Sequence, residues 1–184
     1  MEVNHVGEIN WNYMERLDAE SLRHLMELYG QDVWNLAFTI TKKRDMADDV
    51  SQDVFLKVYH AIHTFRGQSS IKTWLLSITR NMAVNHLRSA FIRRVTLMDR
   101  VSVEGNSDSA EKEALASQFT HEIWGAVLKL PLKLREVLIL HARFELNTKE
   151  ISEVLQLPEG TVKSRLSRAR QKMNRYWEGS AQYE

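Results

Sequence analysis

The sequence predicts an all-α protein of two small helical domains joined by a flexible linker, the second containing a helix-turn-helix. The 184 residues include only 2 prolines and 7 glycines, so long helices are easier to build than a sheet with many tight turns. Apolar residues recur at helical spacing over most of the chain. One polar stretch of small residues, SVEGNSDSAEKEA, breaks this periodicity and predicts a linker over residues 90–117.

Composition argues against several classes of protein. The absence of cysteine removes disulfides, thiolate zinc sites and cysteine nucleophiles. No run approaches the ~18 consecutive apolar residues of a membrane helix, and the first residues lack the basic and apolar regions of a signal peptide, which predicts a soluble cytoplasmic protein. With no phosphate loop, nucleophile motif or catalytic carboxylate pair, we expect no enzyme and no cofactor. His60 and His63 lack a nearby carboxylate or cysteine, so we expect no metal site.

The first domain is expected over residues 19–89, after a flexible N-terminal extension of residues 1–18. The apolar pattern predicts one or two helices over residues 19–41, with Gly30 as a candidate break. Asp45 or Asp48 is the expected cap of the next helix. That helix is amphipathic, and its outer side carries an acidic stripe made of Asp49, Gln52, Asp53, Leu56 and His60.

A short polar loop follows this helix, from Phe65 to Ser70. Gly67 permits a tight turn there, and either Ser69 or Ser70 can cap the next helix. A second helix is expected to run to about Arg88. Among its apolar residues lie cations and amides, a mixture that suits a nucleic-acid strand: Lys72, Arg80, Asn81, Asn85, His86 and Arg88.

The second domain is expected over residues 118–177, followed by a C-terminal tail of residues 178–184. Its first helix is expected to end at Pro131, and a second helix follows. A helix-turn-helix comes next, with Thr148 as the candidate cap of its first helix. Its turn is expected over residues 156–160 and its second helix over residues 161–176. Four apolar residues form the inward stripe of this second helix, namely Val162, Leu166, Ala169 and Met173.

The second helix of the helix-turn-helix is strongly basic. Between Pro158 and Trp177 six cations stand against Glu159 alone, a net charge of +5, although the whole chain carries only +1. Its outward face is expected to carry Ser164, Arg168, Gln171 and Arg175. A helix buried on one side and basic on the other is suited to lie in a DNA major groove.

Two segments resemble one protein family. DVSQDVFLKVY, FRGQSSIKTWL and SITRNMAVNHLR, in that order, resemble region 2 of bacterial sigma factors of the extracytoplasmic-function group of the sigma-70 family. LPLKLREVLILHARFELNTKEISEVLQLPEGTVKSRLSRARQKM resembles region 4 of the same family, which reads the minus thirty-five element. Activators of the response-regulator class carry a similar helix-turn-helix, and the first domain decides between the two classes.

The resemblance implies a factor that binds core RNA polymerase, at the clamp helices of the largest subunit and at the flap, and promoter DNA. The residues implied to bind the polymerase are Asp49, Gln52, Asp53 and Leu56. Those implied to bind the minus ten element are Phe65, Arg66, Gly67, Gln68, Ser69, Arg80, Asn81, His86 and Arg88. Those implied to bind the minus thirty-five element are Lys163, Ser164, Ser167, Arg168 and Gln171.

The resemblance also implies a regulator, usually an anti-sigma factor at the membrane, that covers the binding faces. Trp74 is expected to pack in the core, and Arg165 and Arg170 to contact phosphate or an acidic neighbour rather than a base. Ser167 stands where some relatives carry a bulkier side chain, which leaves the promoter sequence open.

Two alternatives follow from the residues. The first is a DNA-binding regulator that uses only the second domain, with the first domain serving dimerisation or sensing. The second is a helical scaffold that touches no DNA, which conflicts with the net charge of the basic helix. Co-purification with RNA polymerase separates a sigma factor from both.

Overall fold

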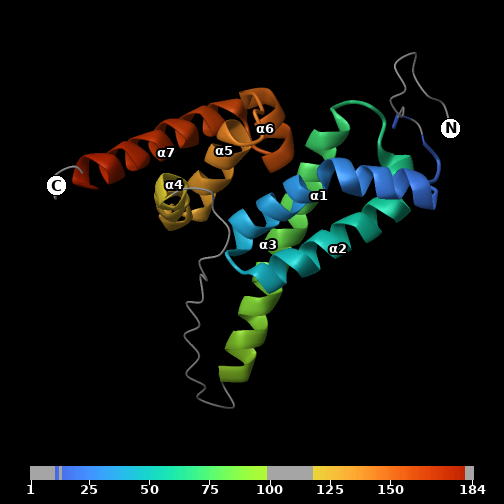
Figure 1. Ribbon diagram of the computed structural model, residues 1–184, viewed down its shortest axis with the longest axis horizontal. Helices are drawn as coiled ribbons and strands as arrows, with labels where there is room; N and C mark the ends of the chain where they lie inside the picture. Colours follow the sequence, from blue (N-terminus) through green and yellow to red (C-terminus); the bar gives the residue numbers. More distant parts are fainter. Residues whose placement is uncertain (1–10, 13, 99–117, 181–184) are drawn as a thin grey trace. The chain divides into compact units, whose positions relative to one another are not determined.

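The computed structural model of the chain describes residues 11–12, 14–98 and 118–180 (Figure 1). Over these ranges it contains helices, turns and loops and no strand, which confirms the all-α prediction. The chain divides into two compact units after His86, within the third helix. The part of the predicted linker over residues 99–117 lies outside the described residues.

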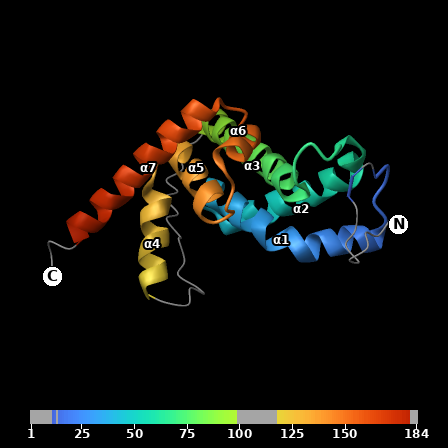
Figure 2. The same cartoon turned by 90° about the horizontal axis from the view of Figure 1, so that it is seen from above.

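The first unit is a helical hairpin crossed by a third helix. Its elements are α1 (Ala19–Thr41), α2 (Arg44–Ala61), the short 3-10 helix η1 (Ile62–Thr64) and the part of α3 (Ile71–Met98) that ends at His86. Helices α1 and α2 run side by side in opposite directions, and α3 crosses them (Figures 1 and 2). Each of the three helices buries apolar side chains almost completely, among them Leu25, Leu36, Ile40, Val50, Val54, Leu75 and Leu76. Burial of one such side chain contributes roughly 1.5–3 kcal/mol, so this shared core holds the three helices together.

The start of α1 and the connection to α2 are set by local hydrogen bonds and backbone geometry. Asp18 Oδ1 accepts a hydrogen bond from the Ser21 backbone N–H at 2.7 Å, and this bond lowers the pKa of the Asp18 carboxyl below its ordinary 3.8. Helix α1 passes through Gly30 without a break. It ends where Lys42 adopts a left-handed conformation with φ of 61°.

The predicted cap of α2 was wrong. The helix begins at Arg44, so Asp45 and Asp48 both lie inside it, and Lys43 at the cap position makes no side-chain cap bond. The left-handed turn at Lys42 shortens the connection to two residues and places the start of the helix ahead of both aspartates. Asp48 Oδ1 instead accepts a hydrogen bond from Trp34 Nε1 at 2.6 Å, which ties α2 to α1.

Helix α3 begins as predicted but ends later. Ser70 Oγ caps it by accepting a hydrogen bond from the Thr73 backbone N–H at 3.0 Å. The helix continues to Met98, beyond the predicted end near Arg88, because no glycine or proline interrupts the chain from Ile71 to Met98. Residues 90–98, which the sequence assigned to the linker, are therefore helical.

The second unit contains α4 (Gln118–Lys129), α5 (Leu132–Ala142), α6 (Thr148–Leu155) and α7 (Glu159–Ser180). Pro131 separates α4 from α5, as the sequence predicts. Helix α7 packs against α4, α5 and α6 (Figure 1). The core beneath it is apolar and contains Val137, Leu140, Ile151, Val154 and Val162, all fully buried.

Helices α6 and α7 form the predicted helix-turn-helix. Gln156 ends α6 in a left-handed conformation with φ of 54°, and α7 starts at Glu159, two residues earlier than predicted. Helix α7 runs on through Ser180, past the predicted end near Tyr176, and the last residues of the predicted tail, 181–184, lie outside the described residues.

Candidate functional site

The outer face of α2 presents a leucine among polar side chains. Leu56 is 61% exposed, and Asp49 and Gln52 on the same face are exposed as well. A single exposed leucine is ordinary on a protein surface. Asp49 lies two turns before Leu56 on the same face, and an apolar residue combined with a carboxylate is typical of a surface that meets a basic partner. Tyr59, which the sequence analysis did not include, is also exposed one turn later and enlarges the apolar part of this face.

Asp53, the fourth residue of the predicted polymerase-binding set, faces α3. Its Oδ2 lies 2.9 Å from Nε2 of His86, and both side chains are partly exposed. The two residues are 33 positions apart, so no local sequence pattern could have paired them. The contact joins the predicted polymerase-binding helix to the predicted DNA-binding helix.

The loop between η1 and α3 begins with a buried aromatic side chain and has an exposed polar tip. Phe65 is only 4% exposed, and its ring lies 5.4 Å from the Trp74 ring, centroid to centroid. Arg66, Gly67 and Gln68 are exposed, and Gly67 has a φ of 66°, which favours glycine. Of the predicted loop residues, Phe65 therefore supports the loop from within. Arg66 and Gln68, which flank Gly67, present their side chains to solvent.

Further along α3, the predicted DNA-binding residues separate onto two sides of the helix. Arg80 Nη1 donates a hydrogen bond to Asn81 Oδ1 at 3.3 Å, and both side chains are half-buried. Arg88 lies two turns later on the same side as Asn81 and is exposed. His86 is about 140° around the helix from Asn81, toward Asp53. The structure therefore places Asn81 and Arg88 on one side of α3, two turns apart, and His86 on another.

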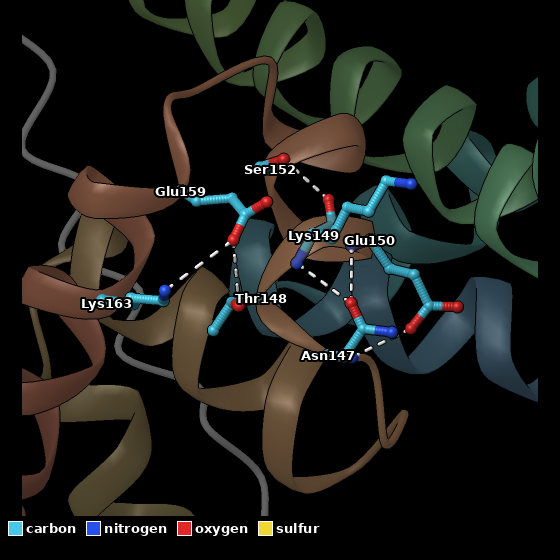
Figure 3. Close-up of polar contacts among 7 residues, drawn as sticks. All are labelled: Asn147, Thr148, Lys149, Glu150, Ser152, Glu159 and Lys163. Atoms are coloured by element: carbon cyan, nitrogen blue, oxygen red, sulfur yellow. Dashed lines mark hydrogen bonds and ion pairs between the residues drawn. The ribbon is translucent and has the colours of Figure 1, made fainter.

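A capping box starts α6 (Figure 3). Asn147 Oδ1 accepts hydrogen bonds from the backbone N–H groups of Lys149 and Glu150 at 2.9 and 3.0 Å. The Glu150 carboxylate in turn accepts from the Asn147 backbone N–H at 2.9 Å. The predicted cap, Thr148, was wrong by one residue. Because the box uses two side chains reciprocally, it satisfies more of the helix's free N–H groups than a threonine one position later could.

Glu159 links the beginnings of α6 and α7 (Figure 3). Its Oε2 accepts a hydrogen bond from Thr148 Oγ1 at 3.4 Å and lies 3.9 Å from Lys163 Nζ. The acidic residue in the first turn of α7 therefore contacts both helices of the motif, and Lys163 is held within reach of it. Both Lys163 and Glu159 remain exposed.

Helix α7 has the two faces that the sequence predicts. Val162, Leu166 and Ala169 are buried, and Met173 is half-buried. The five residues predicted to read the minus thirty-five element are exposed, namely Lys163, Ser164, Ser167, Arg168 and Gln171. A shallow groove of about 370 Å³ runs along one side of this face, where Lys163, Ser167 and Arg170 face His141 and Thr148. The groove is large enough for a phosphate group and is lined by cations.

A buried carboxylate on α5 pairs with a partly exposed arginine on α7. Glu136 is 1% exposed, and its Oε1 lies 3.5 Å from Nη1 of Arg165. Arg135 beside it is also buried, and Nη1 donates to the carbonyls of Leu128 and Leu130 at 2.9 and 3.2 Å. Burial lowers the pKa of the Arg135 guanidinium, and Glu136 acts in the opposite direction. The structure thus gives Arg165 an acidic neighbour, one of its two expected contacts.

The buried charges of α5 were not predicted from the sequence. Arg135 and Glu136 interrupt the apolar run of this helix, and charges inside such a run were the available signal. In the part of the chain that the structure describes, no group of three or more His, Cys, Asp or Glu side chains is placed to hold a metal ion. Among the described helices, none is long and apolar enough to cross a membrane.

Comparison with known proteins relates both units to one family. The Sigma-70 region 2 family matches residues 25–91, and the Sigma-70, region 4 family matches residues 120–173. The chain is 32% identical over 171 residues to the RNA polymerase sigma-H factor of Pseudomonas aeruginosa, and the aligned region covers 88% of this chain and 89% of the relative. It is 29% identical over 153 residues to the ECF RNA polymerase sigma factor SigM of Bacillus subtilis, and the aligned region covers 83% of this chain and 93% of the relative.

A solved structure shows the same fold. The sigma factor RpoE of Bartonella quintana, determined in complex with the anti-sigma factor NepR, matches with a TM-score of 0.69 and 25% sequence identity. The match covers 87% of this chain and 98% of that chain. A region 2 match over the first unit argues against a regulator that uses only its helix-turn-helix. The chain belongs to the extracytoplasmic-function group of the sigma-70 family, the sigma factors that direct RNA polymerase to promoters.

Proposed function

We propose that this sigma factor uses three separate surfaces. The outer face of α2 binds core RNA polymerase, the loop before α3 captures a base of the melted minus ten element, and α7 reads the minus thirty-five element. The chain itself catalyses no covalent step, because nucleotide addition belongs to the polymerase. Its proposed partners, core polymerase and promoter DNA, imply that it works in the cytoplasm.

The proposed polymerase-binding face consists of Asp49, Gln52, Asp53 and Leu56. Its target is the clamp helices of the largest subunit, and the second unit is proposed to reach the flap. Exposed carboxylates accelerate the encounter with a basic surface, and the apolar side chain of Leu56 then gains free energy by leaving water. Such a central apolar residue within a polar rim is the usual arrangement of an interface hot spot.

The proposed minus ten surface joins the loop tip to one side of α3. Unpairing and flipping a base costs about a few kcal/mol, which new contacts to the exposed base must offset. Arg66, Gln68 and Asn81 supply cationic and amide groups for such contacts, and Arg88 lies further along the helix for a phosphate. We propose that His86, which contacts Asp53, also positions α3.

The observation that carries the proposal for the second unit is the division of α7 into a buried apolar face and an exposed basic face. Lys163 and Arg168 are the strongest candidates for base contacts in the major groove, since cations bind the acceptor edge of guanine. Ser164, Ser167 and Gln171 add smaller hydrogen-bonding groups on the same face.

We further propose an anti-sigma factor as a partner. The related RpoE was solved with the anti-sigma factor NepR, which supports regulation of the same kind here. An inhibitor that covers Leu56 and α7 would block polymerase and DNA at the same time. A membrane-bound inhibitor would allow an external signal to release the factor.

The proposed roles can be tested separately by expressing the chain as two fragments. A fragment of residues 1–98, which keeps α3 whole, should bind core polymerase, and a fragment of residues 118–184 should bind promoter DNA weakly. Only the intact chain should direct initiation in a reconstituted reaction, because two linked modules engage both promoter elements at a high effective concentration. Failure of the first fragment to bind polymerase, with the intact chain active, would place the polymerase contacts elsewhere. The proposed domain bounds, 19–89 and 118–177, lie within these fragments.

A further inference from the structure

The described residues before α1 are packed against the first unit, although the sequence predicts a flexible extension. These residues, 11–12 and 14–17, are called here the N-terminal strap. The Trp11 ring stacks on the His24 ring of α1, with centroids 6.3 Å apart and planes at 16°. At the other end of the strap, Leu17 is buried and Asp18 caps α1. The strap is therefore attached to α1 at both ends.

Between these attachments, the strap reaches the loop before α3. A Cβ atom placed on Gly67 would lie 2.8 Å from Asn12 Cγ and closer still to Asn12 Oδ1. The carboxamide of Asn12 therefore lies directly against the backbone of Gly67. No local pattern could have shown this contact, because 55 positions separate the two residues.

The place of this contact on the loop is specific. The two ends of the loop are already held, because Phe65 is buried against Trp74 and Ser70 caps α3. Asn12 touches the tip, where Gly67 has positive φ and where a glycine has the widest choice of backbone conformations. Arg66 and Gln68, the proposed contacts to the captured base, flank this glycine on either side. A neighbour that limits the conformations of Gly67 therefore limits the directions of both side chains.

We propose that Asn12 is a positioning residue for base capture. Its carboxamide braces Gly67, so the loop tip is arranged for the flipped base before the promoter opens. Ordering of the loop then costs less at the moment of capture, which is the general benefit of preorganisation. This inference rests on the proposed role of the loop in binding the minus ten element.

The test compares Asn12→Ala with Glu15→Ala in the full-length chain. Both side chains are exposed and both belong to the strap, so neither change should shift the thermal unfolding midpoint. Asn12→Ala should slow open-complex formation on a duplex promoter by about fivefold, the order of magnitude expected when the backbone of one residue must be ordered at the moment of capture, with unchanged affinity for core polymerase. Amide hydrogen exchange at residues 66–68 should become faster in this variant only. Wild-type exchange and a wild-type opening rate in Asn12→Ala would overturn the proposal.

A set of promoters with a single abasic site at each minus ten position of the non-template strand sharpens the test. If Asn12 acts through base capture, its effect on opening should vanish on the one promoter that lacks the captured base. An effect that persists on every abasic promoter would overturn the proposal, because Asn12 would then act through another route.

The double variant Arg66→Ala/Gln68→Ala separates this inference from the proposed function. If the double variant opens promoters poorly while Asn12→Ala opens them normally, the loop binds DNA without help from the strap and only the inference fails. If the double variant opens promoters at the wild-type rate, the proposed role of the loop fails, and the inference fails with it.

Discussion

Glu136 Oε1 lies 3.5 Å from Nη1 of Arg165, and this contact joins the buried face of α5 to α7, the helix proposed to read DNA. The carboxylate is almost fully buried, whereas the guanidinium keeps some exposure to solvent. Desolvation of a carboxylate is costly unless a cation offsets it. The pair therefore restricts how α7 can rotate and slide on α5, and with it the direction in which the basic face points.

Arg165→Met should destabilise the second unit by about 3 kcal/mol, because it removes the cation that lies 3.5 Å from the buried carboxylate of Glu136. Urea unfolding of the full-length chain, followed by hydrogen exchange in peptides of α7, measures the loss. Arg170→Met, an exposed change on the same helix, is the matched control and should have little effect. Equal losses in the two variants would show that the buried pair does not hold α7.

The double variant Glu136→Leu/Arg165→Met should recover most of this stability, since an apolar pair can replace a buried ion pair. Its promoter binding should then keep the salt dependence of the wild type, because Arg165 is engaged with Glu136 and not with phosphate. If the slope of the logarithm of the binding constant against the logarithm of salt concentration decreased in magnitude by about one, Arg165 would be assigned to the DNA backbone instead.

Leu56→Ala should weaken binding to core RNA polymerase by about tenfold or more, the loss expected for an apolar hot-spot residue. The chain offers a matched control in Leu28→Ala on α1, since Leu28 is 53% exposed and lies outside the proposed face. Both variants should unfold at the wild-type temperature. A titration of labelled factor with core polymerase gives both affinities, and similar losses in the two variants would remove α2 from the interface.

Lys163→Ala and Arg168→Ala should each weaken use of the minus thirty-five element by about 1–3 kcal/mol if the side chain contacts a base. The expected signature is a loss confined to certain base pairs, measured as binding to a panel of single-substituted promoters. Lys172→Ala, on the same helix but outside the proposed set, serves as the control. A uniform loss across the panel would make the residue a phosphate contact.

Asn81→Ala should impair open-complex formation more than closed-complex binding, because its proposed partner base is accessible only after unpairing. The change also removes the acceptor of the hydrogen bond from Arg80, so Arg80→Met is needed beside it to separate the two effects. Permanganate footprinting on duplex and pre-melted promoters follows opening. Normal melting of duplex DNA by Asn81→Ala would exclude Asn81 from base capture.

Asn147→Ala should destabilise the helix-turn-helix by about 1 kcal/mol, because it removes the side chain that caps α6. Thr148→Ala, the neighbouring change, should cost less, since the hydrogen bond that the Thr148 side chain makes to Glu159 is long, at 3.4 Å. Thermal unfolding of the two variants compares them directly. A larger loss for Thr148→Ala would contradict the assignment of the cap.

The sequence predicted the helices, their faces and the helix-turn-helix because these features depend on nearby residues. Period 3.6 in the apolar residues of α2 and α7 separates a buried face from an exposed one whatever the partner is. Predictions of helix ends were less accurate where two signals compete within a few residues. Asn147 and Thr148 can both cap a helix, and only the backbone geometry of the turn selects Asn147.

The contacts that position the candidate sites were decided by tertiary structure. Asp53 meets His86, Glu136 meets Arg165 and Asn12 meets Gly67, and the residues of each pair are far apart in the chain. Which side chains meet across two helices depends on how the helices are rotated and shifted when their apolar faces pack. Periodicity specifies that a face is buried, but many rotations and shifts bury it equally well. The packed core selects one of them, and this choice gives the exposed residues their neighbours.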